Sequence, residues 1–91
     1  MAKRENYNDL YLFMTVVQEG SFTAAAQRLG LAQSGVSRAV RELEERLGVQ
    51  LLVRTTRKLS LTQAGEQLYQ TVRPGFEALD GGLATLAHYR N

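Results

Sequence analysis

The side chains best suited to specific recognition in this 91-residue chain lie in one short stretch, residues 33–41. A glutamine can pair with adenine through two hydrogen bonds, and an arginine can pair with guanine or bind a phosphate. Serine side chains are short, so they let a helix lie close to DNA and donate to a base or a phosphate. The candidate base-reading residues of this stretch are Gln33, Ser34, Ser37, Arg38 and Arg41.

A second candidate group follows at residues 54–58, where basic and hydroxyl side chains occur together. Residues 48–62 contain three basic residues and no Asp or Glu. A local cationic segment of this kind can bind phosphate although the whole chain has a net charge of only +2. The alternative is an ordinary solvated loop, in which threonine and arginine are common. The predicted phosphate-binding residues are Arg54, Thr55, Thr56, Arg57 and Lys58.

Two helices joined by a glycine turn are predicted to position the base-reading residues. The first covers residues 22–29, where Ala25 and Ala26 let another helix approach closely. Gly30 supplies the backbone freedom of a tight turn. Apolar residues then recur every three or four positions and leave the base-reading residues on the opposite face of a helix over residues 33–47. These apolar residues are Leu31, Val36, Ala39, Val40, Leu43 and Leu47.

This pattern predicts a helix-turn-helix over residues 22–41, whose second helix enters the major groove of DNA. Helix pairs with a glycine turn also occur in soluble helical proteins, and alanine pairs often mark only close packing. The cationic segment that follows the second helix favours the DNA-binding interpretation.

The flanking segments predict one more helix and a hairpin. A helix begins near Asn8 and ends at Gly20, after which Ser21 caps the helix at residues 22–29. Alternation of Val49, Leu51 and Val53 with their neighbours predicts a β-hairpin wing with a charged tip over residues 49–61.

The last predicted element is a long helix that starts at the cap Thr62 and continues to Arg90. At 1.5 Å per residue it would be roughly 43 Å long, which is more than the preceding domain can cover. Its apolar stripe predicts a homodimer through this helix, although packing on the same chain would produce a similar stripe. The predicted dimer contacts are Tyr69, Val72, Phe76, Leu79, Leu83 and Leu86.

The predicted fold class is therefore mainly α. A winged helix-turn-helix of three helices and a small β-hairpin wing occupies residues 5–62, and a linker helix for dimerisation occupies residues 62–91.

Composition argues against several other classes of protein. The chain has no cysteine, which excludes disulfides and thiolate metal sites and favours a cytoplasmic location. Its longest apolar run, residues 10–17, is too short to cross a membrane, and the acidic residues around it do not suit a cleaved leader. The single histidine, His88, has no partner at catalytic or metal-binding spacing. We therefore expect no enzyme activity, no metal and no cofactor.

The motifs together resemble the N-terminal DNA-binding domain of LysR-type bacterial transcription regulators. Each motif is short, but their combination and order are specific, and the resemblance covers about residues 8–68. The matching motifs are found at residues 19–23, 25–26, 31–34, 36–38, 43–45, 47–49, 54–57 and 61–65.

The resemblance implies a winged helix-turn-helix whose linker helix pairs two copies. It also implies that Gln33, Ser34, Ser37 and Arg38 meet the major groove, and that residues 54–58 meet the DNA backbone or the adjoining minor groove. Thr23 is expected to contact phosphate at the start of its helix. Such regulators usually continue into a C-terminal domain that binds a small-molecule effector, so this chain is expected to lack that domain.

The sequence thus predicts a dimeric bacterial transcription regulator that reads an interrupted palindrome in double-stranded DNA. A winged helix used only for protein interaction is the alternative outside DNA binding. Within DNA binding, the related head of a molybdate-responsive regulator is a further alternative.

Overall fold

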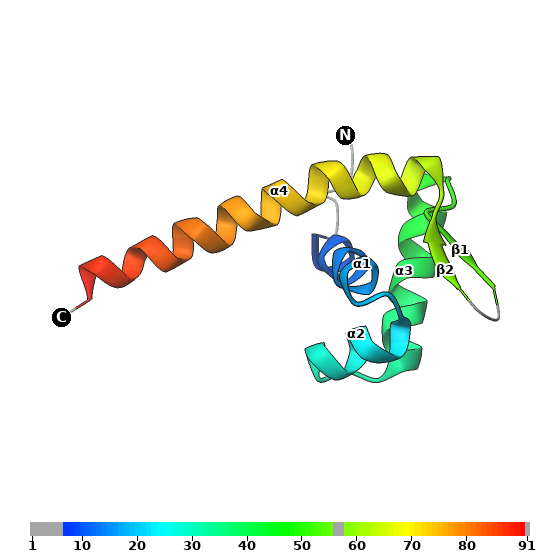
Figure 1. The fold of residues 1–91 in the computed structure, drawn as a ribbon, viewed down its shortest axis with the longest axis horizontal. Helices are drawn as coiled ribbons and strands as arrows, with labels where there is room; N and C mark the ends of the chain where they lie inside the picture. The colour runs from blue at the N-terminus through cyan, green and yellow to red at the C-terminus, as the bar shows by residue number, and fades with distance from the viewer. Residues whose placement is uncertain (1–6, 56–57, 91) are drawn as a thin grey trace.

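The computed structural model describes residues 7–55 and 58–90 (Figure 1). Helices dominate the chain, with one two-stranded antiparallel hairpin inserted before the last long helix, which confirms the predicted fold class. The elements in chain order are α1 (Tyr7–Glu19), α2 (Phe22–Leu29), α3 (Gln33–Leu47), β1 (Leu52–Arg54), β2 (Leu59–Leu61), α4 (Gln63–Thr85) and the 3-10 turn η1 (Leu86–Tyr89).

The predicted helix boundaries hold wherever a cap or a glycine defines them. Ser21 accepts a hydrogen bond from the Ala24 amide at 2.9 Å, and Thr62 accepts one from Gly65 at 3.0 Å. Gly30 ends α2 in the left-handed backbone region, at φ 69°. Helix α1 begins at Tyr7, one residue before the predicted start near Asn8.

The core lies where α1, α2 and α3 meet the hairpin. Ala25 and Ala26 are 0% and 3% exposed, so these small side chains do allow close helix packing. The predicted inward face of α3 is correct in its middle and wrong at its ends. Leu31 lies in the turn before α3 and is 51% exposed, while Leu47 lies at the end of α3 and is 39% exposed. The largest fully buried side chains are Phe13, Leu43, Leu51, Leu52, Val16, Val36, Val40 and Thr15.

The hairpin is present, but the predicted alternation of its first strand is wrong. Leu51 and Leu52 are both buried, whereas Val49 and Val53 are 43% and 40% exposed. The reason is that β1 begins only at Leu52, which pairs with Leu61 of β2. Leu51 precedes the strand, so its side chain does not follow the alternation of β1.

A carboxylate of α3 holds the start of the hairpin in place. Glu44 Oε2 accepts hydrogen bonds from the amides of Leu51 at 2.8 Å and Leu52 at 3.2 Å. Glu44 Oε1 lies 3.7 Å from the Arg54 guanidinium, and the Glu44 side chain is only 15% exposed. The two buried amides therefore find their acceptor on α3 rather than in the sheet.

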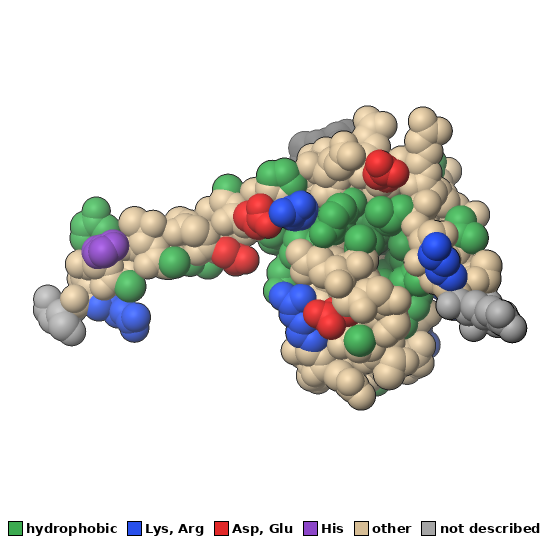
Figure 2. Space-filling view, in the orientation of Figure 1, with side chains coloured by type: hydrophobic (Ala, Val, Ile, Leu, Met, Phe, Trp, Pro, Cys, Tyr) green, Lys and Arg blue, Asp and Glu red, His purple; other side chains and the backbone are tan. Residues whose placement is uncertain are grey.

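Helix α4 first crosses the core and then leaves it. Val72 is buried, and the Phe76 ring packs edge-on against Tyr11 of α1 with the ring centres 5.2 Å apart. The helix continues through Pro74, and its second half projects from the body as an arm (Figures 1 and 2). Within the described residues, no helix has both the length and the apolarity needed to cross a membrane.

We expect Gly65→Ala to destabilise the domain. A Cβ at this position would collide with the Leu51 carbonyl oxygen, which is backbone and already accepts from the Thr62 amide at 3.0 Å. Overpacking of this kind costs roughly 1–3 kcal/mol of unfolding free energy, measurable by urea denaturation. Gly35→Ala is the matched control, because a Cβ there meets no atom within 4 Å and should stabilise α3 by about 0.5–1 kcal/mol. Equal stability of the two variants would contradict this account.

Glu44→Ala should also lower the free energy of unfolding. The substitution leaves the Leu51 and Leu52 amides without their acceptor, at a cost of about 1–3 kcal/mol for each buried group that stays unpaired. The same urea titration measures this loss, with Glu45→Ala at the exposed neighbouring position as the control. A loss of unfolding free energy no larger than that of Glu45→Ala would show that water replaces the carboxylate as the acceptor of these two amides at no cost.

Candidate nucleic-acid interface

One face of α3 is uncovered and carries most of the predicted base-reading residues. Gln33, Ser34, Arg38 and Arg41 are exposed, and Ser37 is half-buried. The opposite face is fixed in the core by Val36, Val40 and Leu43, each 0% exposed. The helix is thus held by its apolar side, and the polar side chains are free to contact a ligand.

A surface hollow beside the start of α3 brings together predicted residues from three elements. Its lining combines the first turn of α2, the first residue of α3 and the hairpin, which are far apart in the sequence. Lys58 and Arg54 are its cationic residues, and no Asp or Glu lines it among the described residues. The predicted residues that line the hollow are Thr23, Gln33, Arg54, Thr55 and Lys58.

Arg54 is held inside this arrangement rather than extended from it. Its guanidinium carbon lies 4.7 Å from the centre of the Phe22 ring, within range of a cation–π interaction. The ion pair with Glu44 offsets part of its charge, and the side chain is 31% exposed. Arg54 therefore joins α2, α3 and the hairpin in addition to lining the hollow.

Thr55 and Lys58, on either side of the hairpin tip, are joined by hydrogen bonds. The Thr55 amide donates to the Lys58 carbonyl at 3.0 Å, and the Lys58 amide donates to Thr55 Oγ1 at 2.9 Å. Thr55 Oγ1 in turn donates to the Lys58 carbonyl at 3.0 Å, so this hydroxyl helps to hold the two residues together. Thr56 and Arg57, also predicted to bind phosphate, lie outside the described residues.

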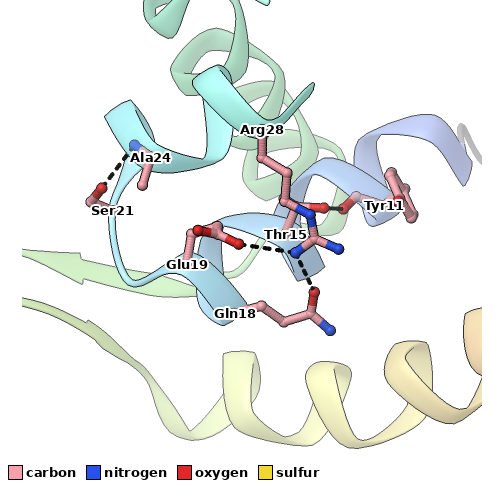
Figure 3. Close-up of polar contacts among 7 residues, drawn as sticks. All are labelled: Tyr11, Thr15, Gln18, Glu19, Ser21, Ala24 and Arg28. Atoms are coloured by element: carbon pink, nitrogen blue, oxygen red, sulfur yellow. Dashed lines mark hydrogen bonds and ion pairs between the residues drawn. The ribbon is translucent and has the colours of Figure 1, made fainter. Parts of the chain in front are cut away.

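Helix α2, which carries the exposed Thr23 in its first turn, is tied to the end of α1. Arg28 donates to Glu19 at 3.0 Å and to Gln18 at 3.2 Å, while Ser21 caps the opposite end of α2 (Figure 3). These contacts fix where Thr23 stands relative to the hollow.

The charged residues of α3 divide into paired and unpaired groups. Arg46 pairs with Asp9 of α1 at 3.1 Å, and Glu44 faces Arg54. Arg38 and Arg41 form no ion pair with any residue that the structure describes. Both side chains are exposed, and no described acid neutralises their charges.

Sequence reasoning missed the Glu44–Arg54–Phe22 contact. These residues are separated by ten or more positions, and no periodicity or motif links them. The only signal was the presence of an acid in α3 and an unmatched arginine in the hairpin, which is too common to predict a contact.

The six predicted dimer contacts fall into two groups. Tyr69 and Phe76 are half-buried and Val72 is buried, all three through contacts within this chain. Leu79, Leu83 and Leu86 are 61%, 67% and 55% exposed on the arm. The surface available to a partner is therefore shorter than the stripe seen in the sequence.

Comparisons with known proteins identify the family. The model of the bacterial regulatory helix-turn-helix protein, lysR family, matches residues 7–66. The HTH-type transcriptional regulator PgrR of Escherichia coli is 47% identical over 89 residues, which is 98% of this chain and 30% of PgrR. PtxR of Pseudomonas aeruginosa is 48% identical over 79 residues, 87% of this chain and 25% of PtxR. The chain thus spans less than a third of the length of these curated relatives.

Solved structures of regulators agree in fold. The crystal structure of a BenM_DBD complex with catB site 1 DNA matches with a TM-score of 0.83 and 36% identity, covering 92% of this chain and 93% of BenM_DBD. Full-length AphB, a virulence activator of Vibrio cholerae, matches with a TM-score of 0.84 and 34% identity over 90% of this chain and 28% of AphB. With its helix-turn-helix, hairpin and long final helix, this chain belongs to the lysR family of bacterial regulatory helix-turn-helix proteins.

Proposed function

We propose that this chain binds double-stranded DNA sequence-specifically, as the DNA-binding part of a bacterial transcription regulator. The observation that carries the proposal is the exposed polar face of α3 beside a hollow lined by Lys58 and by no described acid. BenM_DBD, which shares this fold, has been solved in complex with DNA, and this supports the same role here.

In the proposed complex, α3 lies in the major groove and reads base edges. Gln33 and Ser34 stand in its first turn, where a recognition helix meets the bases. Arg38 follows about one turn later and can bind guanine through two hydrogen bonds. Ser37 is half-buried and approaches the DNA less closely, and Arg41 lies further along the helix, where phosphate is the more accessible partner.

Phosphates on either side of the groove are bound from α2 and the hairpin. Thr23 donates from the first turn of α2, where the backbone amides also favour an anion. Lys58 supplies an exposed charge beside the hairpin tip. Thr55, Thr56 and Arg57 are expected to bind phosphate with it. Arg54 contributes less than Lys58 because Glu44 already pairs with it.

Dimerisation through α4 completes the proposal. Leu79, Leu83 and Leu86 form an uncovered apolar surface on the arm, and such surfaces mark interaction sites. Two copies joined there would each read one arm of an interrupted palindrome. By its resemblance to LysR-type regulators, the whole regulator is expected to act in the cytoplasm and to bind a small-molecule effector through a C-terminal domain; this chain spans 30% of the length of PgrR.

The alternative function is a protein-interaction module without base recognition. It does not account for two arginines without ion pairs beside Gln33 on one face of α3, within the described part of the chain. It also leaves the acid-free hollow unexplained. An enzymatic role has no support from the relatives, which are transcriptional regulators.

Selection of binding sites from a random duplex pool should recover an interrupted palindrome with the native chain. Arg38→Ala should lose roughly 1–3 kcal/mol of binding free energy and relax the preference at one base pair in each half-site. Arg73→Ala, an exposed arginine on α4 paired with Glu77, is the control and should select the native site. Retention that depends only on salt concentration, with no enriched sequence, would contradict base reading.

Lys58→Ala should weaken binding to specific and random duplexes by the same factor. The substitution removes one phosphate contact, so the slope of log K against log salt should become shallower by about 1. Titrations of both duplexes at several salt concentrations measure this change. A loss confined to the specific duplex would instead assign Lys58 to base recognition.

A further inference from the structure

Among the glycines of the described residues up to the first turn of α4, Gly35 is the one that the fold does not require. Three of the others have a positive φ, and Gly65 lies against the Leu51 carbonyl. Gly35 has neither property, because its φ is not positive and a Cβ built on it meets no atom within 4 Å. A glycine inside a helix lowers the stability of that helix relative to alanine. The fold alone would therefore favour alanine at this position.

Gly35 lies on the proposed base-reading face of α3. It is exposed, and it stands in the sequence between Ser34 and Arg38, two of the candidate base-reading residues. Residues three positions apart are neighbours on a helix surface, so Gly35 lies beside Arg38. The next residue, Val36, is 0% exposed and holds this turn against the core. The position without a side chain thus opens toward the proposed ligand.

The neighbouring side chains are short enough for a close approach. Ser34 precedes Gly35, and Ser37 follows it by two residues. A Cβ at Gly35 would project from the backbone by about 1.5 Å, the length of one carbon–carbon bond. A gap of roughly 0.5–1 Å already removes about a quarter to a half of a dispersion contact. The absence of the Cβ therefore decides whether a group of the DNA can touch the backbone of α3 here.

The surface that Gly35 offers is apolar. Its amide donates to the Ala32 carbonyl at 3.1 Å, and a carbonyl at this point of a helix accepts from the amide four residues further on. The group left to meet a base is the Cα with its two hydrogens. Among the base-edge groups of the major groove, the apolar one is the C5 methyl group of thymine.

We propose that Gly35 is a specificity-determining residue of the DNA-binding face and that the methyl group of one thymine packs directly on its Cα. The proposal rests on the proposed base reading by α3 and adds one recognised base to it. Gly35 precedes Arg38 by about 4.5 Å along the helix axis. Successive base pairs are ~3.4 Å apart. The thymine therefore lies one or two base pairs from the pair that Arg38 reads.

Removal of the methyl group from the DNA tests this contact. The probe is the duplex recovered by site selection, with each thymine of one half-site replaced in turn by deoxyuridine. This replacement keeps the base pair and its hydrogen-bonding atoms and deletes only the C5 methyl group. The native chain should bind about fourfold more weakly when the thymine next to the Arg38 pair is replaced, as expected for one buried methyl-sized group.

Gly35→Ala should abolish or reverse this dependence on the methyl group. Its Cβ takes the place of the methyl group, so the variant should bind the thymine duplex about fourfold more weakly than the native chain does. It should bind the deoxyuridine duplex at least as tightly as the thymine duplex. The dependence of binding on salt should not change, because no phosphate contact is lost.

Two controls separate this effect from changes in stability. Gly35→Ala is expected to be more stable than the native chain in urea, so a loss of DNA affinity cannot come from unfolding. Gly81→Ala makes the same change at an equally open glycine of α4. It should keep the fourfold preference for the thymine duplex.

The outcomes separate the role of Gly35 from the proposed base reading. A selected half-site with no thymine at the stated distance, or no loss of affinity on methyl removal, would overturn the role of Gly35 and leave base reading by α3 standing. An equal dependence on the methyl group in Gly35→Ala and the native chain would assign that methyl group to another side chain. A native chain that selects no sequence would overturn both proposals.

Discussion

The arrangement of the proposed interface depends on the contact between the Glu44 carboxylate and the hairpin. A buried amide without an acceptor costs free energy. The amides of Leu51 and Leu52 therefore favour the hairpin position in which Glu44 accepts a hydrogen bond from each of them. That position brings Arg54 within reach of both Glu44 and the Phe22 ring. A single side chain of α3 thus aligns the hairpin with α2, and the hollow between them follows from this alignment.

The arginines of the chain serve two different purposes. Arg28, Arg46 and Arg54 pair with acids of neighbouring elements and hold the helices and the hairpin together. Arg38 and Arg41 have no such partner in the described part of the chain and face solvent. The net charge of +2 therefore understates how cationic the proposed DNA-facing surface is, because Arg54 and Lys58 line the hollow and no described acid does. Phosphate binding depends on the charge of this local surface and not on the net charge of the chain.

Periodicity and capping predicted the helices because both are properties of local sequence. Ser21 and Thr62 cap their helices as expected, and Ala25 with Ala26 mark the close contact of α2 with the core. The errors arose where a tertiary contact overrides the local pattern. Leu51 is buried through the bonds that Glu44 accepts, which shifts the strand alternation by one residue.

The sequence suggested residues for the candidate site but not their geometry. Gln33 and Lys58 could be chosen from their type and context, and Thr23 from the family resemblance, but their meeting in one hollow depends on how three elements pack. The role of Arg54 could not be predicted for the same reason, since its partners Phe22 and Glu44 are distant in the sequence. The apolar stripe of α4 is covered by α1 as far as Phe76 and is exposed beyond it. This division depends on how the two helices pack.

The absence of a side chain at Gly65 has a mechanical consequence. The first turn of α4 lies directly against the Leu51 carbonyl, and the Thr62 hydroxyl donates to the neighbouring Gln50 carbonyl at 2.6 Å. With no free space at this joint, the start of α4 cannot shift without the hairpin, and Phe76 holds the same helix on Tyr11 of α1. The direction in which the arm leaves the body is therefore fixed by the contacts that also place the hairpin beside α3. A partner bound to the arm would consequently also fix the orientation of the DNA-facing surface.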